Sequence, residues 1–309
     1  MKQTKIKGVL VPVITPFRQD LSPDGKRFAA HCRWLLDQGA SGLAIFGTTS
    51  EANSLSVDER IALFDELLAA GIPPARLMPG TGCCAFTDSV RLSRHVVASG
   101  CAGVLMLPPF YYKGVSEEGV FRSFAETIER VGDPRLSIYL YHIPQMSQVP
   151  IPISLIERLL SAYPVAIAGI KDSSGDPANL RALLDAFAGS DFDVFPGSEL
   201  LLLEGLRHGG AGCITATGNV NPGAIAKLYD NWRSADADAM QAGLDAVRKA
   251  IQAFPVIPAV KATLARCTGD DAWSRVRPPL VELAAGQKAQ LAAELQALAF
   301  TMPGIASLA

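Results

Sequence analysis

The chain has few of the features that mark membrane, nucleic-acid-binding or secreted proteins. None of its apolar runs is long enough to cross a bilayer, and it has no block of like charge. The net charge is −2, so we expect no binding to nucleic acid or to an anionic membrane. The basic residues 1–7 precede an apolar stretch, 9–14, that is too short for a signal peptide and contains Pro12. The sequence therefore predicts a cytoplasmic protein.

The six cysteines and four histidines lack the spacing of a metal or disulfide site. The cysteines are scattered through apolar segments, and only Cys83 and Cys84 are neighbours. Dispersed cysteines in a long chain are typical of reduced, buried thiols. The histidines are far apart in the sequence, and no two of them form a motif with an intervening glutamate. A metal-dependent mechanism is not expected, although ligands from distant segments could still form a site.

Short apolar runs alternate with amphipathic stretches over most of the chain. Eight runs predict strands, at residues 8–14, 42–46, 77–79, 103–107, 136–141, 165–171, 193–195 and 212–216. The first helical stretches between them each close at a glycine, as helices often do. Eight strand–helix units predict a parallel (β/α)8 TIM barrel. A doubly wound sheet is the alternative, but no Gly-x-Gly-x-x-Gly turn follows the first strand.

Beyond the predicted barrel, the pattern is helical only. Residues 236–254, 258–266 and 280–298 have the spacing of helices. We therefore expect a catalytic barrel over residues 1–234. Residues 235–309 would form a C-terminal helical extension packed on it, in one structural unit.

Lys171 ends a predicted strand and is the first candidate for chemistry. It follows six apolar or small residues, 165–170, and precedes a polar turn, 172–176. Such a run predicts a strand buried on both faces, so its last residue lies at the rim of a core. Dry surroundings disfavour an ammonium ion, and a partly neutral lysine can attack a ketone to form a Schiff base. Alternatively, Lys171 is a solvated lysine at a strand end.

Polar side chains recur at the carboxyl ends of the predicted strands, where barrels carry their chemistry. The ends read Gly47-Thr48-Thr49-Ser50-Glu51, Pro108-Pro109-Phe110-Tyr111-Tyr112, Tyr139-Leu140-Tyr141-His142, Lys171, Pro196-Gly197-Ser198-Glu199 and Ile214-Thr215. The hydroxyls and backbone N–H groups of the first turn are suited to hold a carboxylate. Tyrosines at strand ends are often packing residues, but opposite a Schiff-base lysine they can carry protons.

Together these groups predict a reaction on an α-keto acid. Lys171 would attack the C2 ketone, and the protonated imine would accept electrons when a proton or a carbon fragment leaves C3. Tyr141, one strand away, is the best candidate for the proton carrier. Thr48 could hydrogen-bond Tyr141, and either Tyr111 or Tyr112 could extend the relay.

Three other side chains are rivals for these roles. Glu51 and Asp172 could act as acid or base, but each is more typical of a residue that orders a turn or caps a helix. Lys261 is the rival reactive lysine. It lies in a helical pattern, 258–262, where a structural salt bridge is the expected role.

Six motifs, in order, resemble those of the dihydrodipicolinate synthase / N-acetylneuraminate lyase family of class I pyruvate-dependent aldolases. They are Val13-Ile14-Thr15-Pro16-Phe17, Gly47-Thr48-Thr49-Ser50-Glu51, Pro109-Phe110-Tyr111-Tyr112, Tyr141-His142-Ile143-Pro144, Gly169-Ile170-Lys171 and Gly212-Cys213-Ile214. The resemblance runs from about residue 8 through 261. It implies the TIM-barrel fold, a Schiff base with pyruvate and no cofactor.

The resemblance also implies roles for individual residues. Lys171 would be the Schiff-base lysine and Tyr141 the catalytic tyrosine. Thr48 and Tyr111 would be its relay partners, with Tyr111 reaching in from a neighbouring subunit. Tyr111 is preferred to Tyr112 by counting from Pro108-Pro109. A loop one residue longer or shorter would reverse that choice. Thr49 and Ile214 would contact the pyruvate part. Members of the family are typically homotetramers, arranged as a dimer of dimers.

The sequence departs from the synthases of this family that make the lysine precursor. Those enzymes usually carry an arginine just after the tyrosine motif, where residues 144–148 here have none, and methionine cannot replace a bidentate cation. Ser50 stands where glycine is usual. Cys84 and Phe110 stand where the lysine-feedback site of some synthases has polar or phenolic groups. These departures argue against the biosynthetic synthase.

The turn Lys171-Asp172-Ser173-Ser174-Gly175-Asp176 looks more like that of aldolases acting on 2-keto-3-deoxy sugar acids or 4-hydroxy-2-oxoglutarate. Candidates for binding a hydroxylated tail are Ser173, Ser174 and Ser198, and Gly197 is a further substrate-binding candidate.

Four functions therefore stay open. The first is a lyase that cleaves or forms a C–C bond between pyruvate and an aldehyde, and the second is a dehydratase of keto-deoxy acids with the same lysine and tyrosine. The third is the synthase, with Arg18, Lys113 or Arg207 replacing the missing arginine. The fourth is a barrel that binds an α-keto acid as a sensor, against which the complete relay argues.

Overall fold

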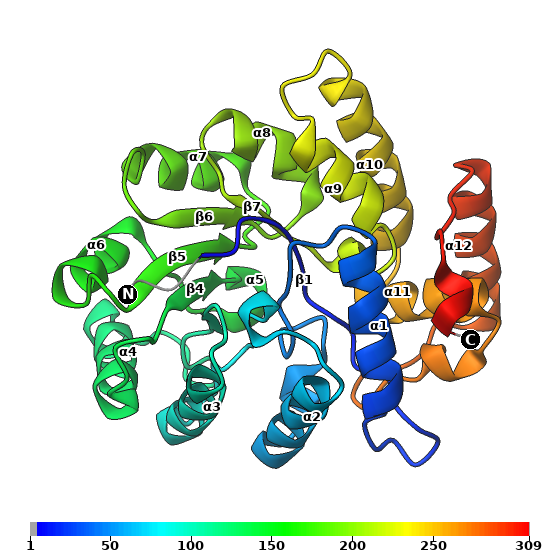
Figure 1. Ribbon diagram of the computed structural model, residues 1–309. Coiled ribbons are helices and arrows are strands. Elements are labelled where there is room, and N and C mark those ends of the chain that lie inside the picture. The colour runs from blue at the N-terminus through cyan, green and yellow to red at the C-terminus, as the bar shows by residue number, and fades with distance from the viewer. Residues whose placement is uncertain (1–4, 309) are drawn as a thin grey trace.

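Parallel strands form a ring inside a layer of helices in the computed structural model, which describes residues 5–308 (Figure 1). The strands are β1 (Gly8–Val11), β2 (Gly42–Leu43), β3 (Val104–Met106), β4 (Ile138–His142), β5 (Ile167–Asp172), β6 (Asp193–Pro196) and β7 (Gly212–Ile214). Parallel pairing joins them in the orders β2-β1-β7 and β3-β4-β5-β6. Seven strands thus form two arcs.

The third predicted strand, 77–79, fills the gap between β2 and β3. Leu77 forms a parallel bridge with Leu43, and Gly80 forms one with Leu105. These bridges are isolated, so the segment is not a regular strand, but it occupies the eighth strand position.

On the other side, the Ala211 N–H donates to the Val194 carbonyl at 2.9 Å and joins β7 to β6. The ring is therefore closed, and the predicted (β/α)8 barrel is confirmed. β1 and β2 are shorter than predicted. Residues 12–14 do not continue the first ladder, where Pro12 has no N–H to donate.

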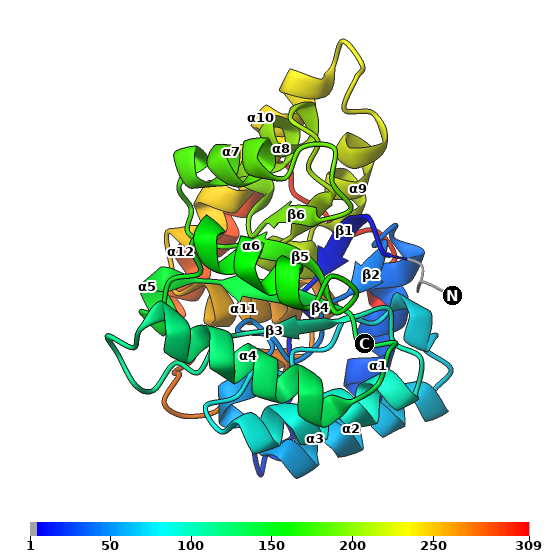
Figure 2. The same cartoon turned by 90° about the vertical axis from the view of Figure 1, so that its left-hand side faces the viewer.

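The outer layer follows the predicted alternation (Figure 2). It contains α1 (Gly25–Asp37), α2 (Val57–Ala69), α3 (Phe86–Ala98), α4 (Glu117–Val131), α6 (Ile153–Ala162), α7 (Pro177–Ala186), α8 (Leu202–Arg207) and α9 (Pro222–Asp230), with the single turn α5 (Pro144–Ser147) after β4. The predicted glycine stops are confirmed, since Gly39, Gly71 and Gly100 have φ angles of 99°, 84° and 84°. Those left-handed conformations suit glycine.

Three further helices, α10 (Ala237–Gln252), α11 (Val256–Thr268) and α12 (Ala285–Ala297), lie at one side of the barrel (Figure 1). Ala259, Val260 and Leu264 of α11 are buried in the same core cluster as the barrel helices. The third helix was predicted too early, from residue 280. It begins at Ala285 because the Gln287 side chain accepts the Ala284 N–H at 3.0 Å and caps the helix there. No helix within residues 5–308 is long and apolar enough to cross a membrane.

A β-bulge in β5 sets which side chains face the barrel interior. Ile138 of β4 pairs with Ile167, but the next residue, Tyr139, pairs with Gly169, so Ala168 is an extra residue in β5. From there the register is regular, and residues paired in parallel strands point to the same face. Tyr141 is therefore level with Lys171. It belongs to a cluster of buried side chains, called here the inner core cluster, that also contains Leu10, Tyr139 and Ile214.

Candidate active site

Lys171 and Tyr141 lie side by side at the carboxyl ends of β5 and β4. The Lys171 Nζ atom is 4.3 Å from the centroid of the Tyr141 ring. Both residues are buried, with exposed fractions of 4% and 3%. Within residues 5–308 no carboxylate forms an ion pair with Lys171. Its amine therefore has an aromatic face as its close neighbour and no ion-pair partner among the described residues.

The Thr48 hydroxyl lies 3.2 Å from the Tyr141 hydroxyl, and either oxygen can be the donor. Thr48 is held in a tight turn after β2. The Gly47 N–H donates to Ser50 Oγ at 3.2 Å, and the Glu51 N–H donates to the Thr48 carbonyl at 3.0 Å. The structure thus brings together Lys171, Tyr141 and Thr48, three of the four residues predicted to be catalytic.

The fourth predicted catalytic residue, Tyr111, is not brought to this group within one chain. Tyr111 and Tyr112 are 74% and 72% exposed, in the loop after β3. Their rings pack edge to face with centroids 5.4 Å apart. Neither makes a hydrogen bond among the contacts of the described residues. Within a single chain the relay therefore ends at Thr48.

Two residues predicted to contact pyruvate lie at the same end of the barrel. Thr49 is buried directly after Thr48 in the turn. Ile214, the last residue of β7, is fully buried and belongs to the inner core cluster together with Tyr141. Both residues therefore lie at the end of the barrel where Lys171 and Tyr141 meet.

The predicted tail-binding residues differ in whether their side chains are already engaged in local hydrogen bonds. Ser173 and Gly197 are in contact, because a Cβ atom added to Gly197 would lie 2.0 Å from Ser173 Oγ. The Gly197 N–H donates to the Asp172 carbonyl at 2.6 Å, which holds the two turns together. Ser198 Oγ instead accepts the Leu200 N–H at 3.3 Å and caps a short 3₁₀ turn, Glu199–Leu201. Ser173 is thus the less constrained hydroxyl.

The two rival carboxylates both order local structure. Asp172 Oδ1 accepts the Ser174 N–H at 3.0 Å, and Oδ2 accepts from the Asn179 amide at 3.1 Å. Glu51 is fully buried and forms an ion pair with Lys261. Burial lowers the pKa of Lys261 to about 8, with Glu51 acting in the opposite direction. The expected salt bridge of Lys261 is confirmed.

Of the three cations considered as replacements for the missing arginine, one lies in the right segment. Arg207 pairs with Asp238 at 2.8 Å, and Arg18 Nη1 donates to Ser22 Oγ at 3.4 Å. Lys113 Nζ donates to the Ser147 carbonyl at 2.9 Å and also contacts the Phe110 carbonyl. It thus lies at the end of α5, one residue beyond Met146.

A buried cluster that sequence reasoning missed supports the end of β7. Glu199, 1% exposed, accepts hydrogen bonds from the Thr215 and Thr217 hydroxyls, and Arg248 of α10 lies 3.4 Å from it. The two threonines fix the turn that follows Ile214. The available signal was the pair of hydroxyls at a predicted strand end. Their partner comes from another turn and could not be read from spacing.

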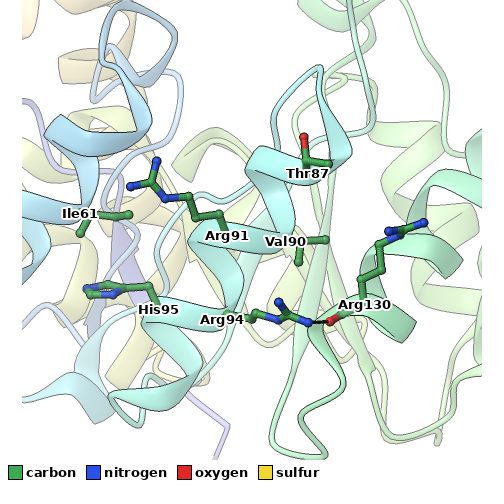
Figure 3. A pocket seen from close by; sticks show the side chains of 7 residues that line it. All are labelled: Ile61, Thr87, Val90, Arg91, Arg94, His95 and Arg130. Atoms are coloured by element: carbon green, nitrogen blue, oxygen red, sulfur yellow. Dashed lines mark hydrogen bonds between the residues drawn. The ribbon is translucent and has the colours of Figure 1, made fainter.

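A large surface pocket lies elsewhere, on the outer helices. It measures about 740 Å³ and is lined by residues of α2, α3 and α4, among them Arg91, Arg94, His95 and Arg130 (Figure 3). Arg94 donates to the Arg130 carbonyl, while Arg91 pairs with Asp58 and His95 with Asp65. Thr48 and Tyr141 line a different, much smaller pocket. The arrangement of reactive groups, not pocket size, identifies the candidate active site.

Comparisons with known proteins agree on one family. The sequence model of the Dihydrodipicolinate synthetase family matches residues 5–298. A relative from Chloroflexus aurantiacus, described as an uncharacterized DapA-like lyase, is 35% identical over 93% of this chain and 95% of its own. A 4-hydroxy-tetrahydrodipicolinate synthase from Gluconacetobacter diazotrophicus is 31% identical over 81% of this chain and 84% of its own.

Solved structures are also similar. Dihydrodipicolinate synthase from Agrobacterium tumefaciens superposes with a TM-score of 0.87 at 30% identity, covering 94% of this chain and 99% of that one. YagE, a prophage protein of Escherichia coli solved in complex with pyruvate, has a TM-score of 0.87 at 28% identity, covering 96% and 100%.

Proposed function

This chain belongs to the dihydrodipicolinate synthetase family and is a lyase of the class I aldolase type, and on that premise we propose that it joins or separates pyruvate and an aldehyde through a Schiff base on Lys171. The observation that carries the proposal is the contact of Lys171 with Tyr141, whose hydroxyl lies 3.2 Å from Thr48. A buried amine beside a hydrogen-bonded phenol can perform both carbonyl attack and proton transfer.

In the proposed cleavage, Lys171 Nζ attacks the C2 ketone of the substrate. Loss of the C2 oxygen as water forms a protonated imine. Tyr141 passes its phenolic proton to the Thr48 hydroxyl, which releases its own proton along the proposed relay, and Tyr141 accepts the proton of the C4 hydroxyl as the C3–C4 bond breaks. The electrons of the C3–C4 bond pass to the imine. The aldehyde leaves, the enamine takes a proton at C3, and water hydrolyses the imine to release pyruvate and free Lys171. No step needs a metal or an organic cofactor.

Two further elements of the proposal concern the complete site. Thr49 and Ile214 are proposed to contact the pyruvate part, as the family resemblance implies. Tyr111 is proposed to join Thr48 and Tyr141 from a neighbouring subunit of a homotetramer. Its exposure of 74% in the single chain leaves it free to do so.

For the substrate, we propose a 2-keto-3-deoxy sugar acid or a 4-hydroxy-2-oxoglutarate-type acid. Ser173 lies two residues after Lys171 and against Gly197, where a hydroxylated tail attached to C4 would extend. The segment that carries an arginine in lysine-precursor synthases presents Met146 instead, 62% exposed. A methionine offers no charge to a second carboxylate.

Borohydride trapping tests the proposal. The protein is incubated with pyruvate and sodium borohydride, and the intact chain and its peptides are analysed by mass spectrometry. We expect a pyruvate-dependent adduct on Lys171 that is absent in Lys171→Met. Folded protein without an adduct would contradict the proposal and favour a sensor or a degenerate barrel. An adduct on Lys261 would contradict the site assignment.

The synthase is the second candidate, since several relatives bear that name and Lys113 lies at the end of α5. Two assays separate the candidates once the adduct is established. Release of pyruvate from 2-keto-3-deoxygluconate or 4-hydroxy-2-oxoglutarate indicates the aldolase. Condensation of pyruvate with aspartate semialdehyde indicates the synthase, and consumption of the keto-deoxy acid without pyruvate release indicates a dehydratase.

A further inference from the structure

A buried ion pair connects the turn that carries Thr48 to the C-terminal helices. Lys261 of α11 and Glu51 of the turn after β2 are 210 residues apart in sequence, and neither side chain has any exposed surface. Removing two charges from water is costly, and the attraction between them offsets that cost only when the geometry is well satisfied. The pair therefore needs an explanation beyond surface charge balance.

Both charges are fully engaged by defined partners. Glu51 Oε1 accepts from Lys261, and Oε2 accepts the Arg277 N–H at 2.9 Å. Lys261 also donates to the Arg275 carbonyl at 2.6 Å and lies 4.4 Å from the centroid of the Phe17 ring. Partners on both sides fix the carboxylate in one position.

The backbone of Glu51 is held in a conformation that it would not choose freely. Its φ and ψ angles are 56° and 34°, in the left-handed region that disfavours residues with a side chain. Such a conformation persists where the surroundings over-determine it. The anchored carboxylate supplies that constraint.

The constraint reaches the reacting groups through few steps. The Glu51 N–H donates to the Thr48 carbonyl at 3.0 Å, and Thr15 Oγ1 donates to the Ser50 carbonyl at 2.7 Å. The same turn places Thr48 Oγ1 at 3.2 Å from the Tyr141 hydroxyl. A displaced Glu51 would therefore shift Thr48 relative to Tyr141.

Attachment of α11 to the barrel does not require the ion pair. Ala259, Val260 and Leu264 of that helix are already buried in the main core cluster. Apolar side chains of similar volume in place of a buried ion pair are often neutral or stabilising. Stability alone is thus a poor reason for two buried charges at this place.

We propose that the Lys261–Glu51 ion pair positions Thr48 for proton transfer with Tyr141, so that Glu51 and Lys261 are positioning residues for the proton step and not for imine formation at Lys171. The inference rests on the proposed Schiff-base function. It assigns the C-terminal helices a role in catalysis without any contact with the substrate.

The test compares Glu51→Gln, Lys261→Met and the double variant with the unaltered protein. For each, melting temperature, borohydride trapping of pyruvate, and kcat and KM for pyruvate release from the preferred keto acid are measured. We expect kcat to fall by roughly 10- to 100-fold, as a small misplacement of a catalytic group would cause, with KM and trapping at saturating pyruvate nearly unchanged. The double variant should be no slower than the slower single variant, because both break one unit.

Two further variants act as controls. Lys288→Met removes an exposed ion pair with Glu282 in the same C-terminal region and should leave kcat unchanged. Lys261→Arg keeps the charge and should recover part of kcat. If Lys261→Met does not fold, Glu51→Gln, which keeps the side-chain volume, decides the question.

A folded Glu51→Gln protein with unaltered kcat would overturn the inference. So would loss of kcat and trapping in proportion, since that pattern is a structural defect that includes Lys171. Failure of the unaltered protein to trap pyruvate is a different result, which overturns the proposed function itself and the inference with it.

Discussion

Tyr139 and Tyr141 are two residues apart on β4 and belong to the same inner core cluster, yet their hydroxyls serve opposite ends of the barrel. The Tyr139 hydroxyl donates to Asp193 Oδ2 at 3.1 Å, at the start of β6. The Tyr141 hydroxyl contacts Thr48 at 3.2 Å, at the carboxyl end of β2. Residues at the amino-terminal face of such barrels serve stability, and the chemistry lies at the other face. The two tyrosines therefore form a matched pair for experiment, one for each face.

Replacing each tyrosine with phenylalanine should separate catalysis from stability. Tyr141→Phe removes the proposed proton carrier, and we expect kcat to fall by about 10²- to 10⁴-fold with little change in melting temperature. Tyr139→Phe deprives the buried Asp193 of a donor, and we expect normal kcat with a loss of about 1–2 kcal/mol in the free energy of unfolding. Steady-state kinetics and urea unfolding of both variants measure this. A large loss of kcat in Tyr139→Phe would contradict the assignment of roles.

A second prediction concerns acid stability at the first turn of α2. Hydrogen bonds from Arg277 lower the pKa of Glu59 to about 2 from 4.5. A lowered carboxyl pKa stabilises the fold above the unfolded value of 4.5, and that contribution is lost as pH falls through 2. Glu59→Gln should therefore cost about 1–2 kcal/mol of unfolding free energy at pH 7, a value reduced for the partial exposure of the pair. The difference from the unaltered protein should shrink between pH 4.5 and 2, and a constant difference would contradict the prediction.

Much of the barrel was predictable because each strand is a short apolar run with its own boundary. Even the segment around Leu77, too irregular to form a named strand, was found from its composition and lies at the predicted position. The bulge at Ala168 was not predicted, although Gly169 beside it is a residue that often marks a bulge in a strand. Without that bulge, Lys171 would not share a register with Tyr141.

The same distinction holds for the site. Thr48, Tyr141 and Lys171 were predicted because each lies at or just after the end of a predicted strand, and parallel barrels gather those ends. The Glu51–Lys261 pair joins residues 210 positions apart. Local periodicity carries no information on such a contact. Tyr111 is proposed to act from a neighbouring subunit, and a contact of that kind follows neither from the sequence pattern nor from the structure of one chain.

The buried histidine of α1, a base and not a carboxylate, gives a second prediction on the pH dependence of stability. Burial lowers the pKa of His31 to about 4 from 6.5, although its Nε2 lies 3.1 Å from the Asn219 carbonyl. The unfolded chain then binds a proton between pH 6.5 and 4 that the folded protein does not bind, so unfolding becomes easier as pH falls through that window. We expect up to about 3 kcal/mol of stability to be lost from this group. Urea unfolding between pH 7 and 4 should show a weaker pH dependence in His31→Gln, and an equal slope would exclude His31 as the cause.

Two serines at the mouth of the barrel allow a test of substrate recognition. Ser173 packs against Gly197 and is free to donate its hydroxyl, whereas Ser198 caps the turn Glu199–Leu201. Ser173→Ala should raise KM for the hydroxylated keto acid by about tenfold, since one lost hydrogen bond is worth about 1 kcal/mol or more. Trapping of pyruvate, which has no hydroxylated tail, should be unaffected. Ser198→Ala should instead lower the free energy of unfolding by roughly 1 kcal/mol, with KM unchanged, because only a cap is lost. If both variants raise KM equally, recognition is shared by the two turns, and if neither does, the tail of the substrate extends elsewhere.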